Sequence, residues 1–333
     1  MGLFGFTVKN SFRIARRLPA VATAAAAGWL GYSAFKKREA PPLPSPFPSD
    51  LELVPDLAVG SIAVHRSKVG AAEDATPVLL VHSVNAAASS YEMAPLFQRI
   101  ERDRPVAAVD LPGFGHSDRP DIAYTPDLMA GALATVLGTY DRPVHVVALS
   151  LGSEFAARAA LIRPDRVRSL TFISPTGMGR KSRVDEVDRS PFDSVLSISL
   201  LGQAVFDLLI TDPSIRYFLD KSFTGEADPG LAVFAGLSAR QPGARYAPLA
   251  FVRGRLFTPD ALSRVYEPLL VPSLVIYDED PYTDFADLPG FTAGGDGLRH
   301  AERIPGTRGL PHFERPDQTL DAMERFWKDV DSR

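Results

Sequence analysis

The chain of 333 residues contains no cysteine. Without cysteine it has no disulfide bond, no thiolate nucleophile and no cysteine-based zinc site. It has only six histidines, and no two of them have the i, i+4 spacing of a metal site on one helix. No GxGxxG segment follows the first apolar runs, so no dinucleotide-binding loop is indicated. We therefore expect neither a metal nor an organic cofactor.

The N-terminal 40 residues have almost no acidic residues, and the rest of the chain has the opposite net charge. Residues 1–40 carry seven basic residues and one acidic residue, a balance of +6, whereas residues 41–333 carry 29 basic and 39 acidic residues, a balance of −10. An acidic body lacks the basic face that phosphate binding needs, which argues against nucleic acid as the partner. The basic N-terminal part indicates a membrane surface or a targeting role instead.

Residues 1–40 have the pattern of a membrane-associated segment. Residues 18–35 are uncharged, and as a helix they would span about 27 Å, close to the apolar thickness of a bilayer. A short basic amphipathic stretch precedes them. We expect membrane association through residues 1–40, with a cleaved export signal and a soluble cytoplasmic tail as the open alternatives. Residues 41–50 contain five prolines and predict an extended linker.

Short apolar runs alternate with helical patterns from residue 51 onward. Such runs are typical of a parallel sheet that is buried on both faces, which predicts an α/β fold with a mostly parallel sheet flanked by helices. The expected strands are residues 60–67, 77–82, 105–110, 143–149, 167–173, 272–277 and 299–304.

Residues 179–261 interrupt this alternation with apolar helix-like segments at 194–210 and 212–223. They predict a helical insertion between two parts of one core, residues 51–178 and 262–333. The insertion either adds core packing or forms an apolar lid over a cleft.

The sharpest local motif is Ala148-Leu149-Ser150-Leu151-Gly152, which follows an apolar strand and opens a helix. It is a GxSxG nucleophile elbow with alanine in the first glycine position. Small residues flank the serine because the strand–turn–helix bend is tight. The bend presents the serine hydroxyl at the carboxyl edge of the sheet and directs the Leu151 N–H toward an oxyanion formed there.

With these segments the chain resembles the α/β-hydrolase superfamily over residues 51–333. The resemblance is carried, in order, by PVLLVHSVNAAASSYEMAPL, VDLPGFGHSDRP, VVALSLGSEFAARAA, VRSLTFISP, VPSLVIYDEDPYTDF and IPGTRGLPHFERP. It implies an α/β-hydrolase fold with a helical cap. It also implies a nucleophile at Ser150, oxyanion-hole amides at Val84 and Leu151, and an acid at Asp280, with Asp278 as the alternative.

The family's terminal pattern G-H-x-P-H-x-E-x-P departs from this sequence at one position. Laid without gaps on residues 308–316, the pattern places the catalytic histidine on Gly309 and a second, structural histidine on His312. A serine hydroxyl needs an adjacent base to become a nucleophile. Either His312 takes over that role in a rearranged loop, or it remains structural and the base is missing.

The sequence thus leaves two hypotheses, of which we favour the first. One is a serine hydrolase of the esterase or lipase type, acting on a hydrophobic ester, thioester or related small acyl compound through Ser150, His312 and Asp280. The other is a catalytically impaired protein of the same fold that binds a hydrophobic ligand or a partner at the membrane.

Overall fold

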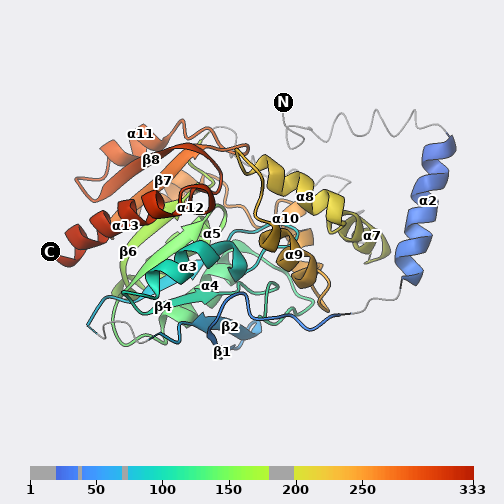
Figure 1. Ribbon diagram of the computed structural model, residues 1–333, viewed down its shortest axis with the longest axis horizontal. Helices are drawn as coiled ribbons and strands as arrows, with labels where there is room; N and C mark the ends of the chain where they lie inside the picture. The colour runs from blue at the N-terminus through green and yellow to red at the C-terminus, as the bar shows by residue number, and fades with distance from the viewer. Residues whose placement is uncertain (1–19, 37–39, 70–73, 180–198) are drawn as a thin grey trace.

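The computed structural model describes residues 20–36, 40–69, 74–179 and 199–333, which form a layered α/β body with helices beside it (Figure 1). One sheet has the strand order β1-β2-β4-β3-β5-β6-β7-β8, in which β2 pairs antiparallel with β1 and β4 and the remaining pairs are parallel. The strands are β1 (Asp50–Asp56), β2 (Gly60–Arg66), β3 (Val78–Val81), β4 (Val106–Val109), β5 (Val144–Leu149), β6 (Val167–Ile173), β7 (Ser273–Glu279) and β8 (Arg299–Arg308).

The seven predicted strands are all present, within a few residues of their expected bounds. The sequence missed only β1, at the edge of the sheet. Its residues DLELVPD are mostly exposed and include Pro55, so the strand lacks the continuous apolar run that marks the others. Proline is tolerated there because an edge strand leaves one row of N–H groups unpaired.

Helices cover both faces of the sheet, as a parallel sheet requires. In β3, Val78 and Leu80 belong to the core beneath α3 and α13, while Leu79 and Val81 belong to the core beneath α4 and α5. The helices of the body are α3 (Ala94–Ile100), α4 (Pro126–Leu137), α5 (Gly152–Ile162), α11 (Leu288–Ala293), α12 (Pro311–Glu314) and α13 (Pro316–Asp331). The predicted α/β fold is therefore confirmed.

Four described helices lie between β6 and β7, at one side of the body (Figure 1). We call them the cap helices: α7 (Ser199–Leu209), α8 (Asp212–Lys221), α9 (Pro229–Ser238) and α10 (Tyr246–Val252). They share a small apolar core that includes Phe206, Ile210 and Ile215, and Ala87 from the loop after β3 packs into the same core. The cap helices thus rest on the loop that follows β3.

The N-terminal helix α2 (Ala20–Phe35) packs against cap helix α7 and stands outside the α/β body (Figure 1). The Trp29 indole N–H donates to the Ala204 carbonyl oxygen at 2.8 Å. The buried Ser33 hydroxyl donates to the Asp207 carboxylate at 2.5 Å. Within the described residues, none of the helices has both the length and the apolar character needed to span a bilayer.

The proline-rich linker is not a free tether. Phe47 is 4% exposed and its ring stacks on Phe97 of α3 with a centroid distance of 3.9 Å. The Pro41 carbonyl oxygen accepts a hydrogen bond from the Gln241 side chain, which follows α9. We call residues 41–49 the strap, because they lie along the body up to the start of β1.

Candidate active site

Ser150 lies between β5, at the middle of the sheet, and α5. Its φ is +50°, in the left-handed region that costs a residue with a Cβ about 1–3 kcal/mol. The Ser150 N–H donates to the Ile173 carbonyl oxygen at 2.8 Å, which ties the bend to the neighbouring strand β6. A Cβ on Gly152 would lie 2.3 Å from the His82 carbonyl oxygen. The bend therefore requires glycine at 152 and holds Ser150 in a strained position at the carboxyl end of the strand.

The loop after β3 is fixed beside this bend by buried side chains. The His82 ring accepts the Leu111 N–H at Nε2, 2.9 Å away, so its proton is on Nδ1 and is donated to the Ser83 carbonyl oxygen. The Glu92 carboxylate accepts the Ser83 N–H at 2.8 Å and the Asn85 side-chain amide at 2.7 Å. The loop backbone is thus held from two sides.

Two backbone N–H groups of this region are free to bind an anion. Neither the Val84 N–H nor the Leu151 N–H has a hydrogen bond to another described residue. Leu151 is the residue just before the N-terminus of α5, where helix N–H groups favour negative charge. The side chains of both residues are buried, and Ser150 is only partly covered.

Asp280 follows β7, and its Oδ1 accepts the N–H groups of Tyr282 and Thr283 at 2.6 and 3.0 Å. A Cβ on Gly309 would lie 3.4 Å from Asp280 Oδ2. The position that the family pattern assigns to the catalytic histidine is therefore next to the position assigned to the acid. Gly309 itself has a φ of +69°, and its N–H donates to the Glu279 carbonyl oxygen.

The alternative acid, Asp278, has other partners. Its carboxylate accepts from Arg303 Nε at 2.6 Å and from the Thr307 N–H at 3.0 Å. Burial alone would raise the pKa of Asp278, but these hydrogen bonds outweigh it and the pKa lies below its usual value. Asp278 thus joins β7 to β8, while Asp280 is the carboxylate that faces Gly309.

The histidine of the C-terminal loop, His312, is fully buried in α12. Its Nε2 bonds to the Glu92 carbonyl oxygen at 2.8 Å, and Nδ1 has no hydrogen-bond partner among the described residues. Burial lowers the pKa of His312 to about 4. The ring forms no hydrogen bond with Ser150 or Asp280, so the structure does not bring together the three residues expected from the sequence.

Two glutamates of this region gave no signal in the sequence. Glu92 is 6% exposed and connects the loop after β3 to His312. Glu154, one turn past Ser150, is 1% exposed and lies inside the fold. It accepts hydrogen bonds from the Thr176 hydroxyl and the Thr258 N–H, and burial raises its pKa. Both carboxylates brace loops around the serine.

Comparison with known proteins identifies the family of the chain. Residues 78–322 match the model of the Alpha/beta hydrolase family. Among curated proteins, the chain is 30% identical over 137 residues to a haloalkane dehalogenase of Agrobacterium fabrum, covering 41% of this chain and 42% of that protein. It is 43% identical over 74 residues to an esterase of Mycobacterium tuberculosis, covering 22% of this chain and 25% of that protein. The chain thus spans less than half the length of these relatives.

Solved structures match over much more of the chain. A bacterial membrane phospholipase A has a TM-score of 0.66 at 20% identity, covering 94% of this chain and 92% of that one. A serine hydrolase of carbazole degradation has a TM-score of 0.65 at 19% identity, covering 84% and 99%. At these identities the likeness concerns the fold alone, which is the fold that the ordered motifs of the sequence predicted.

Proposed function

Because the chain belongs to the alpha/beta hydrolase family, we propose that it is a slow serine hydrolase that acts on a hydrophobic ester, thioester or related small acyl compound. One observation carries the proposal: Ser150 has a φ of +50° in the bend between β5 and α5. Strain of this kind persists only where the surrounding structure holds it, and it clusters at functional sites.

The roles follow from the geometry. Ser150 Oγ attacks the acyl carbon, and the tetrahedral oxyanion is received by the N–H groups of Leu151 and Val84, which bind no other described residue. Oxyanion donors of this kind each contribute about 10²–10³ in rate. The proton of the Ser150 hydroxyl passes to water, and the leaving alcohol or thiol takes a proton from water. A further water molecule then hydrolyses the acyl-enzyme, which releases the acid and restores the Ser150 hydroxyl. Asp280 is the acid beside the histidine position.

The hydrolase is slow because the base is absent. Gly309 occupies the position beside Asp280, and His312 instead bonds to the Glu92 carbonyl oxygen. Loss of the histidine in a Ser–His–Asp triad costs on the order of 10⁶ in kcat in subtilisin. What remains, roughly 10³–10⁴ over water, comes from the oxyanion hole and substrate binding. That residual level needs no serine, so turnover through Ser150 is expected only slightly above it.

An apolar substrate is supported by the surroundings of the site. The loop that carries Val84 continues to Ala87, which is part of the apolar core of the cap helices. Tyr91, in the turn that precedes α3, stacks on Phe234 of cap helix α9. We propose that the cap helices act as a lid over an apolar site. The esterase and phospholipase among the similar proteins act on acyl esters.

Association with a membrane through residues 1–40 belongs to the same proposal. The +6 charge of this segment and the exposed rings of Tyr32 and Phe35 on α2 suit an anionic lipid surface. The full chain should sediment with anionic lipid vesicles, and a chain lacking residues 1–40 should not. Equal sedimentation of the two would remove this part of the proposal.

The test of the activity is Ser150-dependent chemistry. The full chain is treated with a fluorophosphonate probe and assayed on p-nitrophenyl esters of short and long acyl chains, beside Ser150→Ala. We expect slow labelling of the unchanged chain that vanishes in Ser150→Ala, and weak turnover that falls in that variant to the level set by the oxyanion-hole amides and substrate binding alone. If the unchanged chain shows neither labelling nor turnover, or if both persist unchanged in Ser150→Ala, the hydrolase proposal fails.

A second candidate is a ligand-binding protein without turnover, and the buried contact of His312 with Glu92 favours it. In that case long-chain fatty acids or their non-hydrolysable ether analogues bind the chain while Ser150→Ala changes neither binding nor any hydrolysis. Ser150-dependent hydrolysis would exclude this candidate.

A further inference from the structure

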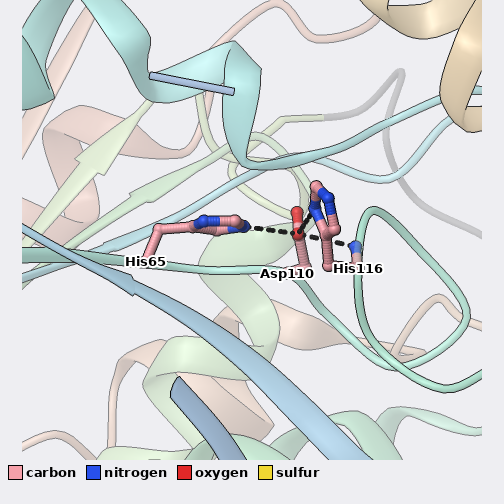
Figure 2. Close-up of side chains that lie close together, drawn as sticks. All are labelled: His65, Asp110 and His116. Carbon is pink, nitrogen blue, oxygen red and sulfur yellow. Dashed lines mark hydrogen bonds and ion pairs between the residues drawn. The ribbon is translucent and has the colours of Figure 1, made fainter. Parts of the chain in front are cut away.

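Three side chains from separate segments converge at the carboxyl end of β4, outside the site around Ser150. His65 comes from β2, Asp110 follows β4, and His116 belongs to the loop after it (Figure 2). His65 Nε2 lies 3.1 Å from Asp110 Oδ2, and His116 Nδ1 lies 3.6 Å from the same oxygen. The three ligand atoms are all within 4.8 Å of one another.

The outward nitrogen of each imidazole faces a hydrogen-bond acceptor. His116 Nε2 donates to the Leu43 carbonyl oxygen of the strap at 3.1 Å. His65 Nδ1 faces the Ser49 hydroxyl at 3.4 Å, and that hydroxyl donates its own proton to the Phe47 carbonyl oxygen. A metal ion between the rings and Asp110 would keep the protons on these outward nitrogens; without an ion, His65 Nε2–H donates to Asp110 Oδ2 at 3.1 Å. Outward bonds of this kind orient the imidazole ligands of metal ions.

The carboxylate of Asp110 is buried without an ion pair to any lysine or arginine in the described part of the chain; its side chain is 1% exposed. His116 Nδ1 is buried and has no hydrogen-bond partner. Two ring nitrogens and one carboxylate oxygen thus converge where a positive charge is needed.

We propose that His65, Asp110 and His116 bind one divalent transition-metal ion of the Zn²⁺ class. Two imidazoles and a carboxylate are a ligand set that Zn²⁺ uses. Ligand atoms about 2.0–2.1 Å from a tetrahedral ion are about 3.3 Å apart. The separations of 3.1 and 3.6 Å from Asp110 Oδ2 lie on either side of that value. The two ring nitrogens lie within 4.8 Å of each other, so the rings would close around the ion.

One of the three side chains lies next to solvent. His116 lines a surface hollow of about 480 Å³ that Pro242, Gly243 and Tyr246 also line. The ligand atoms themselves are buried, so an ion would enter from this side by a small movement of the His116 loop.

The ion has a structural role in this proposal. Its two imidazole ligands each bond outward to the strap, at Leu43 and Ser49. The Asp110 carboxylate also accepts the Ser90 N–H at 2.7 Å, in the turn that contains Glu92. The ion therefore fastens the strap to the body next to the loop that holds Val84.

The test uses the untagged full chain freed of metal with a chelator. Zn²⁺ is titrated by calorimetry, and Co²⁺ is added in parallel because its visible absorption reports imidazole coordination. We expect one ion per chain, a higher melting temperature with Zn²⁺ and a Co²⁺ spectrum of low coordination number. His65→Gln and His116→Gln should each weaken Zn²⁺ binding by at least the roughly 10–100-fold that follows loss of an outer partner.

His300→Gln is the control, because His300 is exposed on β8 and away from the cluster. It should bind Zn²⁺ as the unchanged chain does. The proposal is overturned if the unchanged chain binds no Zn²⁺ or Co²⁺ at one per chain, whatever the variants do. It is also overturned if both histidine variants bind Zn²⁺ as tightly as the unchanged chain. The ion would then lie elsewhere, and the cluster would hold only protons.

Discussion

Gly309 lies against Asp280: a Cβ at position 309 would be 3.4 Å from Asp280 Oδ2. The carboxylate that the family resemblance assigns as the acid therefore faces a position that has no side chain. The carbonyl oxygen and Cβ of Ser222, which follows cap helix α8, would be 3.5 and 3.6 Å from the same Cβ, which is ordinary van der Waals contact. The backbone brings the family's acid and histidine positions together, and the sequence supplies only the acid.

Gly152→Ala should destabilise the chain and disturb the serine. The added Cβ would lie 2.3 Å from the His82 carbonyl oxygen, which belongs to the backbone and cannot rotate away. We expect a loss of about 1–3 kcal/mol in the free energy of unfolding, as for other overpacked sites, together with slower labelling of Ser150. Chemical denaturation and probe labelling measure the two effects.

Gly131→Ala is the matched control for that substitution. Gly131 is in helix α4, and a Cβ there meets nothing within 4 Å. Alanine should stabilise the chain by about 0.5–1 kcal/mol through helix propensity. A Gly152→Ala chain as stable and as reactive as Gly131→Ala would contradict the close contact between the elbow and the loop after β3.

The free energy of unfolding of His312→Gln should depend less on pH, between about 6.5 and 4, than that of the unchanged chain. The folded pKa of His312 is about 4 against 6.5 in the unfolded chain, so the unfolded state binds one more proton between these values. Stability contributed by the neutral ring is present above pH 6.5 and is lost as the pH falls toward 4. The slope there is about 1.4 kcal/mol per pH unit for one proton.

Chemical denaturation of His312→Gln and of the unchanged chain at a series of pH values isolates the contribution of His312 to the free energy of unfolding. Their difference in unfolding free energy should change with pH between about 6.5 and 4 and stay constant above pH 7. A difference independent of pH would mean that His312 is not held neutral in the folded chain.

Phe47→Ala should release the strap from the body. Phe47 is 4% exposed and stacked on Phe97, and the loss of a buried phenylalanine costs about 3–5 kcal/mol. Hydrogen exchange should show faster exchange in residues 41–49. Phe35→Ala is the matched control, because Phe35 is 89% exposed; similar behaviour of the two variants would mean that the strap is not docked.

Much of the fold could be predicted because the parallel strands are buried on both faces. Runs such as residues 77–82 and 143–149 are apolar apart from one histidine each, and this pattern is visible in one sequence without any knowledge of strand pairing. The edge strand β1 has no such run, and its pairing with β2 depends on contacts that local sequence does not display. The docking of α2 on α7 was missed for the same reason, since Trp29 and Ala204 are 175 positions apart.

The candidate site was predictable where a local motif describes it. The tight bend at Ser150 demands small neighbours, so the motif is visible within five residues. The contact between Gly309 and Asp280 brings two separate loops together, and only the family resemblance predicted it. Glu92 was missed because its contact with His312 spans 220 positions and the local sequence does not distinguish a buried glutamate from an exposed one. The catalytic roles of Ser150, Asp280 and His312 stay predictions.

The most direct test of the account is the rate at which a fluorophosphonate labels Ser150 in Gly309→His, beside the unchanged chain and Gly309→Asn. Asparagine tolerates the φ of +69° but supplies no base. The account predicts that histidine, placed beside Asp280, raises the rate by about 10²-fold, the lower range of a general base, while asparagine does not. The account is contradicted if Gly309→His labels no faster than the unchanged chain and His312→Gln abolishes the labelling, since His312 would then be the base.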